Sequence, residues 1–261
     1  MRSLFPYAGS SGKYARLIAE IIRREGYGVY AEPMFGSGSV FFHLRPEASY
    51  VNDIEPLNAN LYREIRSNPN EIKRLLRQMP PEKDYFLELQ ECIVNMPPGP
   101  KMAASWYYLL ILCYNGVVKK KDSRPYLTWG DRYKTWEQRL PLYAQRISVA
   151  SIFLQSAAIT CEDYSRLPTA DIAFFDPPWI GSAEDYGVEF DHHRLSRYLR
   201  LYNGKWILTI NDHVDAHEYY DPIARWTMDL APNYVVAPVA HGRGKRRELL
   251  MTNFLPVMYG H

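Results

Sequence analysis

The stretch VYAEPMFGSGSVFFHL, residues 29–44, decides the fold class. It combines a short buried strand, a glycine-rich turn and the start of a helix. The plan repeats in ASYVNDIEPLNANLYREI, residues 48–65, where the strand runs to Val51 and the polar pair Asn52-Asp53 precedes a helix. Upstream, residues 12–28 have the apolar spacing of an amphipathic helix that ends at glycine. Strand–turn–helix units in series predict an α/β sheet.

The strand pattern returns near residue 158, in AAITCED, ADIAFFDPP, KWILTIND and finally ELLMTNF. Asp53 follows the strand that runs to Val51, Asp176 ends the strand in ADIAFFDPP, and the two stand 123 residues apart. The single α/β unit between them needs about half of that length. We therefore predict a catalytic domain in two parts, residues 1–56 and 151–261, around an inserted subdomain at 57–150. Within the insertion, residues 71–112 predict helices broken at Pro80-Pro81 and Pro97-Pro98, and residues 117–139 show no regular period.

The composition predicts a cytoplasmic protein that does not enter membranes. The 261 residues suit one large domain with an insertion. The three cysteines lie far apart in the sequence, and we expect them to be reduced thiols. The N-terminus has no signal-peptide pattern, and the longest apolar run, residues 106–114, is too short to span a bilayer. The net charge of +2 neither favours nor excludes nucleic acid as a partner.

The glycine-rich turn EPMFGSG, residues 32–38, is a candidate cofactor site. Its glycines permit close approach of a ligand to the backbone, and Asp53 lies 21 residues beyond Glu32, near the distance typical of a ribose-binding acid. The turn carries no basic residue, which argues against a triphosphate. An ordinary tight βα turn is the alternative.

The motif DPPW, residues 176–179, follows an apolar strand and is a candidate catalytic turn. Asp176 would lie at the carboxyl end of the strand, where open α/β sheets bind ligands. Prolines stiffen the backbone, and the Pro177 carbonyl can join Asp176 in accepting both hydrogens of an amino group. Trp179 can stack on the ring that bears the amine. The pattern therefore suits an exocyclic amine of a nucleobase, and a strand-ending turn with a core Trp is the alternative.

Taken in order, EPMFGSG, VNDIEP and DIAFFDPPW resemble the Dam-type DNA adenine-N6 methyltransferases, and the resemblance runs from about residue 5 to about residue 256. FPYAGSSGKYARLI, LCYNGVVKKKDSRPYLTWGDRY and KRRELLMTNF resemble further segments of that family. The resemblance implies a Rossmann-like fold with a seven-stranded, mostly parallel sheet and an inserted, helical DNA-recognition subdomain. It also implies S-adenosylmethionine (AdoMet) as cofactor and methyl transfer to a flipped adenine of double-stranded DNA, with a cognate restriction enzyme as a conceivable partner.

The resemblance also implies residue roles. Asp176, Pro177, Pro178 and Trp179 would hold the target base, with Trp in place of the more frequent Tyr. The residues that would hold the cofactor are Tyr7, Gly12, Lys13, Glu32, Phe35, Gly36, Ser37, Gly38, Asp53, Asp163 and Asp176.

The insertion carries a basic and aromatic segment that predicts DNA contacts. Residues 115–146 hold eight Lys or Arg against three acids, a net charge of +5, interleaved with Tyr126, Trp129, Tyr133 and Trp136. A second basic patch lies at residues 242–247. The expected DNA contacts are Asn115, Lys119, Lys120, Lys121, Arg124, Tyr126, Arg132, Lys134, Arg243 and Lys245. A solvated charged face is the alternative.

Three other functions stay open at this point: methylation of RNA adenine, methylation of the cytosine amine, and non-catalytic DNA binding. His213 and His217 are four residues apart but have no third ligand at convincing spacing, so we expect no metal site. Asn211 and Asp212 end another strand and would either line the base pocket or cap a turn.

Overall fold

The computed structural model describes residues 3–6, 11–121, 124–181, 190–230 and 247–257. Seven strands form one sheet in the order β5-β2-β1-β6-β7-β9-β8. Their bounds are β1 (Tyr30–Glu32), β2 (Ser49–Asn52), β5 (Ala157–Thr160), β6 (Ile172–Phe175), β7 (Lys205–Asn211), β8 (Trp226–Asp229) and β9 (Glu248–Thr252). Neighbouring strands are parallel from β5 to β7, whereas β9 is antiparallel to both β7 and β8. This sheet confirms the predicted fold class.

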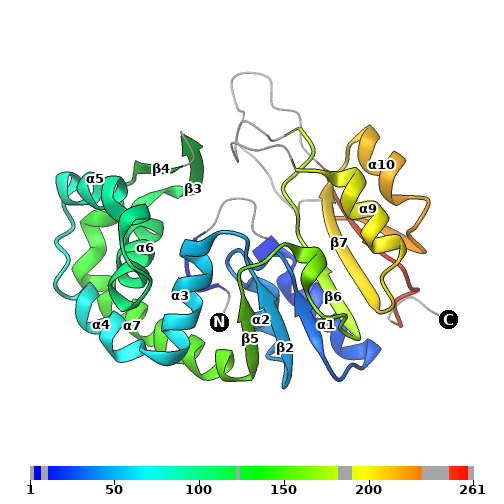
Figure 1. The fold of residues 1–261 in the computed structure, drawn as a ribbon, viewed down its shortest axis with the longest axis horizontal. Coiled ribbons are helices and arrows are strands. Elements are labelled where there is room, and N and C mark those ends of the chain that lie inside the picture. The colour runs from blue at the N-terminus through cyan, green and yellow to red at the C-terminus, as the bar shows by residue number, and fades with distance from the viewer. Residues whose placement is uncertain (1–2, 7–10, 122–123, 182–189, 231–246, 258–261) are drawn as a thin grey trace.

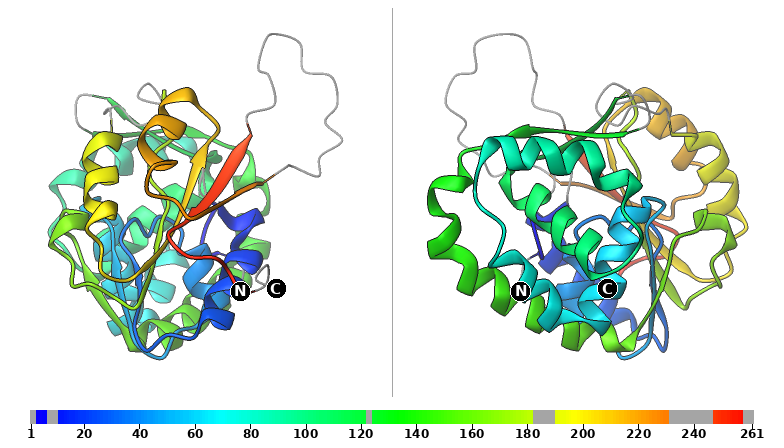
Figure 2. Two further views of the ribbon diagram at one scale, coloured as in Figure 1. Left: turned by 90° about the vertical axis from the view of Figure 1, so that its right-hand side faces the viewer. Right: turned by 60° about the vertical axis from the view of Figure 1, so that its left-hand side comes forward.

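Helices cover both faces of the sheet, and β6 shows why. Ile172 and Phe174 point into a core shared with α1 (Ala15–Glu25) and α2 (Ser39–Leu44). Ala173 and Phe175 point to the other face, into a core shared with α9 (His192–Arg200) and α10 (Val214–Tyr220). A central parallel strand is apolar on both sides because both of its faces are buried. Figure 2 shows the sheet between these two helical layers.

The helical part of the chain lies beside the β5 edge of the sheet (Figure 1). It comprises α3 (Pro56–Ser67), α4 (Pro69–Leu76), α5 (Lys83–Cys92), α6 (Pro100–Leu112), α7 (Trp136–Phe153) and a hairpin of β3 (Cys113–Lys121) with β4 (Arg124–Trp129). Short 3-10 turns are η1 (Ser11–Lys13), η2 (Ile93–Asn95), η3 (Arg132–Thr135), η4 (Leu154–Ser156) and η5 (Tyr164–Arg166). Every residue of α6 from Met102 to Leu112 is buried, so α6 is the centre of this part.

The proline pairs separate the helices as predicted, since α4, α5 and α6 lie on either side of residues 80–81 and 97–98. The segment from residue 117, whose sequence shows no regular period, forms the β3–β4 hairpin. In β4, Pro125 and Leu127 are buried while Arg124 and Tyr126 are exposed, so the strand has a period of two that its charges hide. Strand β8 was missed, because its residues Trp226–Asp229 are half-buried or exposed.

The order of the strands creates a switch point in the sheet. From β1 the chain passes to β2 and β5 on one side, and then returns to β6 on the other side of β1. In open α/β sheets, ligands bind beyond the carboxyl ends of the strands at such a point. We therefore expect a ligand site beyond the carboxyl ends of β1 and β6.

Candidate active site

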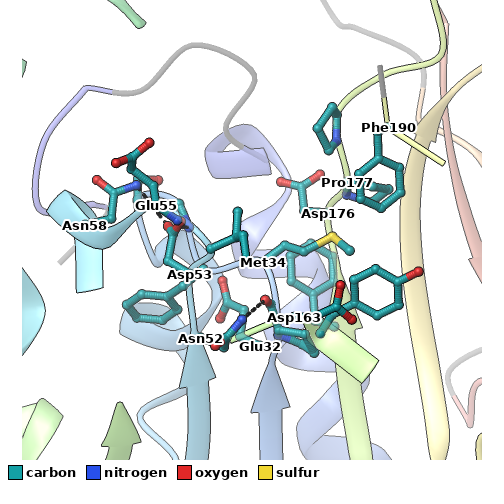
Figure 3. A pocket seen from close by; sticks show the side chains of 18 of the residues that line it. Glu32, Met34, Asn52, Asp53, Glu55, Asn58, Asp163, Asp176, Pro177 and Phe190 are labelled. Carbon is teal, nitrogen blue, oxygen red and sulfur yellow. Dashed lines mark hydrogen bonds between the residues drawn. The ribbon is translucent and has the colours of Figure 1, made fainter. Parts of the chain in front are cut away.

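A cavity of about 550 Å³ opens at this switch point. That size is typical of pockets for small molecules and cofactors. Its lining comes from the ends of β1, β2 and β6, from the turns after these strands and after β5, from α3, α6 and α9, and from the β3–β4 hairpin. The lining residues include Glu32, Pro33, Met34, Phe35, Gly36, Ser37, Asn52, Asp53, Glu55, Asn58, Trp106, Val118, Lys120, Glu162, Asp163, Tyr164, Phe174, Asp176, Pro177, Pro178, Phe190, Asp191 and Arg194. In Figure 3, Asp53 and Asn58 lie on one side of the cavity and Asp176 and Pro177 on the other.

The glycine-rich turn forms the floor of the cavity between β1 and α2. Gly36 and Gly38 have φ angles of 49° and 64°, which glycine adopts without strain. A Cβ atom at Gly38 would lie 2.7 Å from the ring of Phe35, so this position also lacks room for a side chain. Phe35 itself is buried against Tyr62, at a ring centroid distance of 4.6 Å. The Ser37 hydroxyl lies 2.9 Å from that of Ser39.

Asp53 faces the turn and is held by three donors. Its Oδ2 accepts from the Gly36 amide at 3.1 Å and from Asn58 Nδ2 at 2.9 Å, and its Oδ1 accepts from the Glu55 amide at 2.9 Å. The indole of Trp106 on α6 donates to Asn58 Oδ1 at 2.8 Å. Burial raises the pKa of Asp53 to about 6, although these donors oppose the shift. A helix of the expected insertion thus orients a carboxylate of the cavity, a link that sequence reasoning missed.

Glu32 lines the cavity and bonds to residues on both sides of the turn. Its Oε2 accepts from the Tyr30 hydroxyl at 2.8 Å and from the Phe41 amide in the first turn of α2 at 3.0 Å. Burial raises the pKa of Glu32 to about 8, and the charge of Asp176 adds to the shift. Near neutral pH the side chain therefore carries a proton for most of the time. It lines the cavity and also ties β1 to α2.

Asp163 lies at the mouth of the cavity, paired with Arg194 of α9. Two guanidinium nitrogens donate to its two oxygens, each at 2.8 Å, and the Ser165 hydroxyl donates to Oδ1 at 2.6 Å. The guanidinium also lies over the Tyr164 ring, 5.1 Å from its centroid. The bonds from Arg194 and Ser165 hold the pKa of Asp163 well below its usual value. Arg194 carried no sequence signal, because it lies 31 residues from its partner on an ordinary helix.

The DPPW turn brings its first three residues to the cavity. Asp176, Pro177 and Pro178 line it, and Asp176 Oδ1 accepts from the Thr209 hydroxyl at 2.6 Å. Trp179 is half-buried and is not among the described residues that line the cavity. The turn therefore presents a carboxylate and a stiff backbone to the cavity.

The N-terminal segment is only partly described. Tyr7 lies outside the described residues, and Gly12 and Lys13 form η1. The Lys13 ammonium is 2.9 Å from Glu248 Oε2, a buried carboxylate on β9. Neither Gly12 nor Lys13 is among the described lining residues, so their expected cofactor contacts stay predictions.

The residues predicted to contact DNA divide into exposed and engaged groups. Asn115, Lys119, Arg124 and Tyr126 are exposed, and Asn115 has a φ of 53°. Lys120 points to the cavity and pairs with Glu55 at 3.2 Å.

Of the other members of that set, Arg132 bonds within the insertion, Lys134 is exposed, and the rest are not described. Arg132 Nη1 donates to the Ile111 and Cys113 carbonyls at 3.4 Å, and the Lys134 ammonium lies 5.8 Å from the centre of the Tyr133 ring. The Lys121 side chain, Arg243 and Lys245 lie outside the described residues.

The role suggested for Trp136 at the DNA was wrong, because its side chain is 1% exposed and packs against Tyr108 and Tyr143. The two histidines have ordinary partners. His217 bridges Asp212 and Asp221, and His213 accepts from the Asp215 amide at the start of α10. Across the described ranges there is no cluster of side chains suited to a metal ion. In the same ranges, no helix has the length and apolar character needed to cross a bilayer.

Carboxylates dominate the cavity. Asp53, Glu55, Glu162, Asp163, Asp176 and Asp191 line it together with the protonated Glu32, against two cationic side chains, Lys120 and Arg194. Such a lining disfavours a polyphosphate and suits a ligand that carries a positive charge and hydroxyl donors. A fold of this topology, with an acid-rich pocket and an Asp-Pro-Pro turn at its switch point, is typical of enzymes that bind a nucleotide-like cofactor.

Comparison with known proteins identifies the class. The family described as D12 class N6 adenine-specific DNA methyltransferase matches residues 7–219, and the chain belongs to that family. It is therefore an AdoMet-dependent enzyme that methylates the N6 amine of adenine in DNA.

Three relatives share low sequence identity with this chain. Type II methyltransferase M1.LlaDCHI of Lactococcus lactis subsp. cremoris is 26% identical, over 70% of this chain and 68% of the relative. Type II methyltransferase M.CviBI of Paramecium bursaria Chlorella virus NC1A is 22% identical, over 74% and 76%. Type II methyltransferase M.MjaIII of Methanocaldococcus jannaschii is 24% identical, over 58% of each chain.

The residues of the cavity fit AdoMet. The carboxylate-rich lining suits its sulfonium charge, Gly36 and Ser37 bring backbone to the cavity, and Asp53 offers an acceptor to ribose hydroxyls. When bound, the cofactor supplies an electrophilic methyl group.

Proposed function

We propose that this one cavity holds the cofactor at its Asp53 side and a flipped adenine at its Asp176 side. The observation that carries the proposal is the continuity of the lining from Asp53 to Asp176 and Pro177 (Figure 3). A methyl group can pass directly between two ligands only when they share a single enclosed space. The duplex must release the adenine for it to enter such a space, so the proposal includes base flipping.

The chain's own residues then carry out distinct tasks. The Asp176 carboxylate and the Pro177 carbonyl accept the two hydrogens of the N6 amine and turn its lone pair toward the methyl donor. An ionised Asp176 also stabilises the positive charge that develops on the nitrogen during transfer. Pro177 and Pro178 keep the turn stiff, because their rings fix φ. The ring of Trp179 stacks on the base after a change of position, since it does not line the cavity as described.

The partner in this proposal is double-stranded DNA, and the helical part between residues 57 and 150 is its recognition subdomain. The exposed side chains of Lys119, Arg124 and Tyr126 on the β3–β4 hairpin support it. The hairpin also reaches the cavity through Val118 and Lys120, so DNA held there would lie beside the reacting base. We extend the proposal to a cognate restriction endonuclease, because the three relatives are named type II methyltransferases. The proposal also places the protein in the cytoplasm.

The test is methyl transfer from labelled AdoMet to duplex DNA, single-stranded DNA and RNA, followed by identification of the methylated base. We expect N6-methyladenine in the duplex and a loss of transfer in Asp176→Asn, with AdoMet binding retained. Equal or faster methylation of single-stranded substrates would overturn the duplex assignment. Transfer by Asp176→Asn near the wild-type rate would overturn the role of the turn.

A further inference from the structure

Strand β7 supports the catalytic turn with two polar side chains on one face. The register pairs Phe175 with Leu208, so Asp176 and Thr209 come next on adjacent strands. Side chains of a strand alternate between faces, which places Thr209 and Asn211 on the same face as Ile207. That face is the one to which Phe174, two residues before Asp176, also points. Both polar residues therefore lie beneath the DPPW turn.

Thr209 contacts the carboxylate that the proposed mechanism uses. Its side chain is fully buried, and its hydroxyl donates to Asp176 Oδ1 at 2.6 Å. A hydroxyl bond of this length to a carboxylate is short and is strengthened by the charge. The bond restricts the rotation of the carboxylate and so sets the direction in which its oxygens face a substrate amine.

Asn211 holds the other end of the same turn. Its Oδ1 accepts from the Ile180 amide at 2.9 Å, and its Nδ2 donates to the Ile180 carbonyl at 3.1 Å. The two prolines between these anchor points have no amide hydrogen to bind the sheet. Strand β7 thus supplies the turn with side-chain bonds at its first residue and just beyond its last.

We propose that Thr209 is a positioning residue for methyl transfer, because it sets the orientation of the Asp176 carboxylate. Asn211 holds the far end of the same turn in place relative to β7. The inference rests on the proposed role of Asp176 as an acceptor for the adenine amine. A carboxylate free to rotate would present an oxygen to the amine for only part of the time, and misplacement of about 1 Å can lower a rate about 100-fold.

The experiment compares Thr209→Val, which keeps the shape and removes the hydroxyl, with Thr209→Ser, which keeps the hydroxyl. Thr252→Val is the matched control, because Thr252 is equally buried and its hydroxyl donates at 2.6 Å to the carbonyl of Phe254, two residues after the end of β9. Single-turnover methylation, AdoMet affinity, DNA affinity and thermal melting are measured for each variant.

We expect Thr209→Val to lower the single-turnover rate about 10- to 100-fold with both affinities unchanged. Thr209→Ser should restore most of the rate, and Thr252→Val should lower melting without lowering the rate. A Thr209→Val rate equal to wild type, while Asp176→Asn is inactive, would overturn this inference and leave the proposed function standing. Equal rate losses in Thr209→Val and Thr252→Val would overturn it as well, because they would reflect stability alone. An active Asp176→Asn would instead overturn the proposed function.

Discussion

Replacing Asn58 by leucine should make AdoMet binding more sensitive to acid. In the wild type, Asn58 donates to Asp53 Oδ2 at 2.9 Å, and burial places the pKa of Asp53 at about 6. In the proposed function Asp53 accepts from the ribose hydroxyls of the cofactor, and a carboxylate accepts more strongly when it is ionised. Wild-type affinity should therefore fall as the pH is lowered through about 6, where the folded protein takes up a proton on this group.

The magnitude follows from the lost bond. A hydrogen bond to a charged group contributes about 1.5–3 kcal/mol, and each pKa unit corresponds to about 1.4 kcal/mol. Loss of the Asn58 donor should therefore raise the pKa of Asp53 by at least about one unit, toward 7. At about pH 6 the ionised fraction would fall from about one half to about one tenth, so AdoMet would bind about fivefold more weakly than to the wild type. Near pH 8 the two proteins should differ by much less.

The assay is calorimetric titration with AdoMet at several values of pH, with melting as the folding control. Asn60→Leu is the matched variant, because Asn60 is also buried on α3 but bonds the backbone of Gly99 and not Asp53. Glu32, whose pKa is about 8, would add a separate step at higher pH that all three proteins share. A wild-type affinity that is constant from about pH 5.5 to pH 8 would refute the role of Asp53. A loss of the same factor at every pH in Asn58→Leu would show direct contact by Asn58 instead.

Four further changes test other parts of the molecule. Asp176→Ala should nearly abolish methyl transfer while calorimetry still shows AdoMet binding, since it removes an acceptor for the reacting amine; retained turnover would contradict this role. Gly38→Ala should destabilise the fold by about 1–3 kcal/mol in urea unfolding, because φ is 64° and the new Cβ would meet a ring at 2.7 Å, and a neutral effect would show that the turn can relax. Glu32→Gln should flatten the dependence of melting on pH between about 5 and 8. The buried acid has a folded pKa of about 8, above its unfolded value of 4.5, so its stabilising contribution is lost as the pH rises through this range, and an unchanged pH profile would argue against it. Lys119→Ala with Arg124→Ala should weaken DNA binding and reduce its salt dependence by about one unit of slope per lost phosphate contact, with AdoMet affinity constant; parallel loss of both ligands would indicate misfolding.

The fold class and the two turns that line the cavity could be predicted from the sequence alone. Strand–turn–helix units identify an α/β sheet, because periodicity and turn residues act over a few neighbours along the chain. The glycine turn at residues 36–38 and the Asp-Pro-Pro turn at 176–178 are also local, since their backbone requirements are written into consecutive residues. Both turns line the cavity, as a switch point in a parallel sheet requires.

The side chains that orient these groups could be identified only from the folded structure. Thr209 meets Asp176 across 33 residues, because the register of β6 against β7 places them side by side. Trp106 reaches Asn58 across 48 residues, because α6 packs on α3. Arg194, 31 residues from Asp163, looks in sequence like any basic residue on a helix. Such partners are set by strand register and helix packing, which depend on the whole fold and leave no pattern among neighbouring residues.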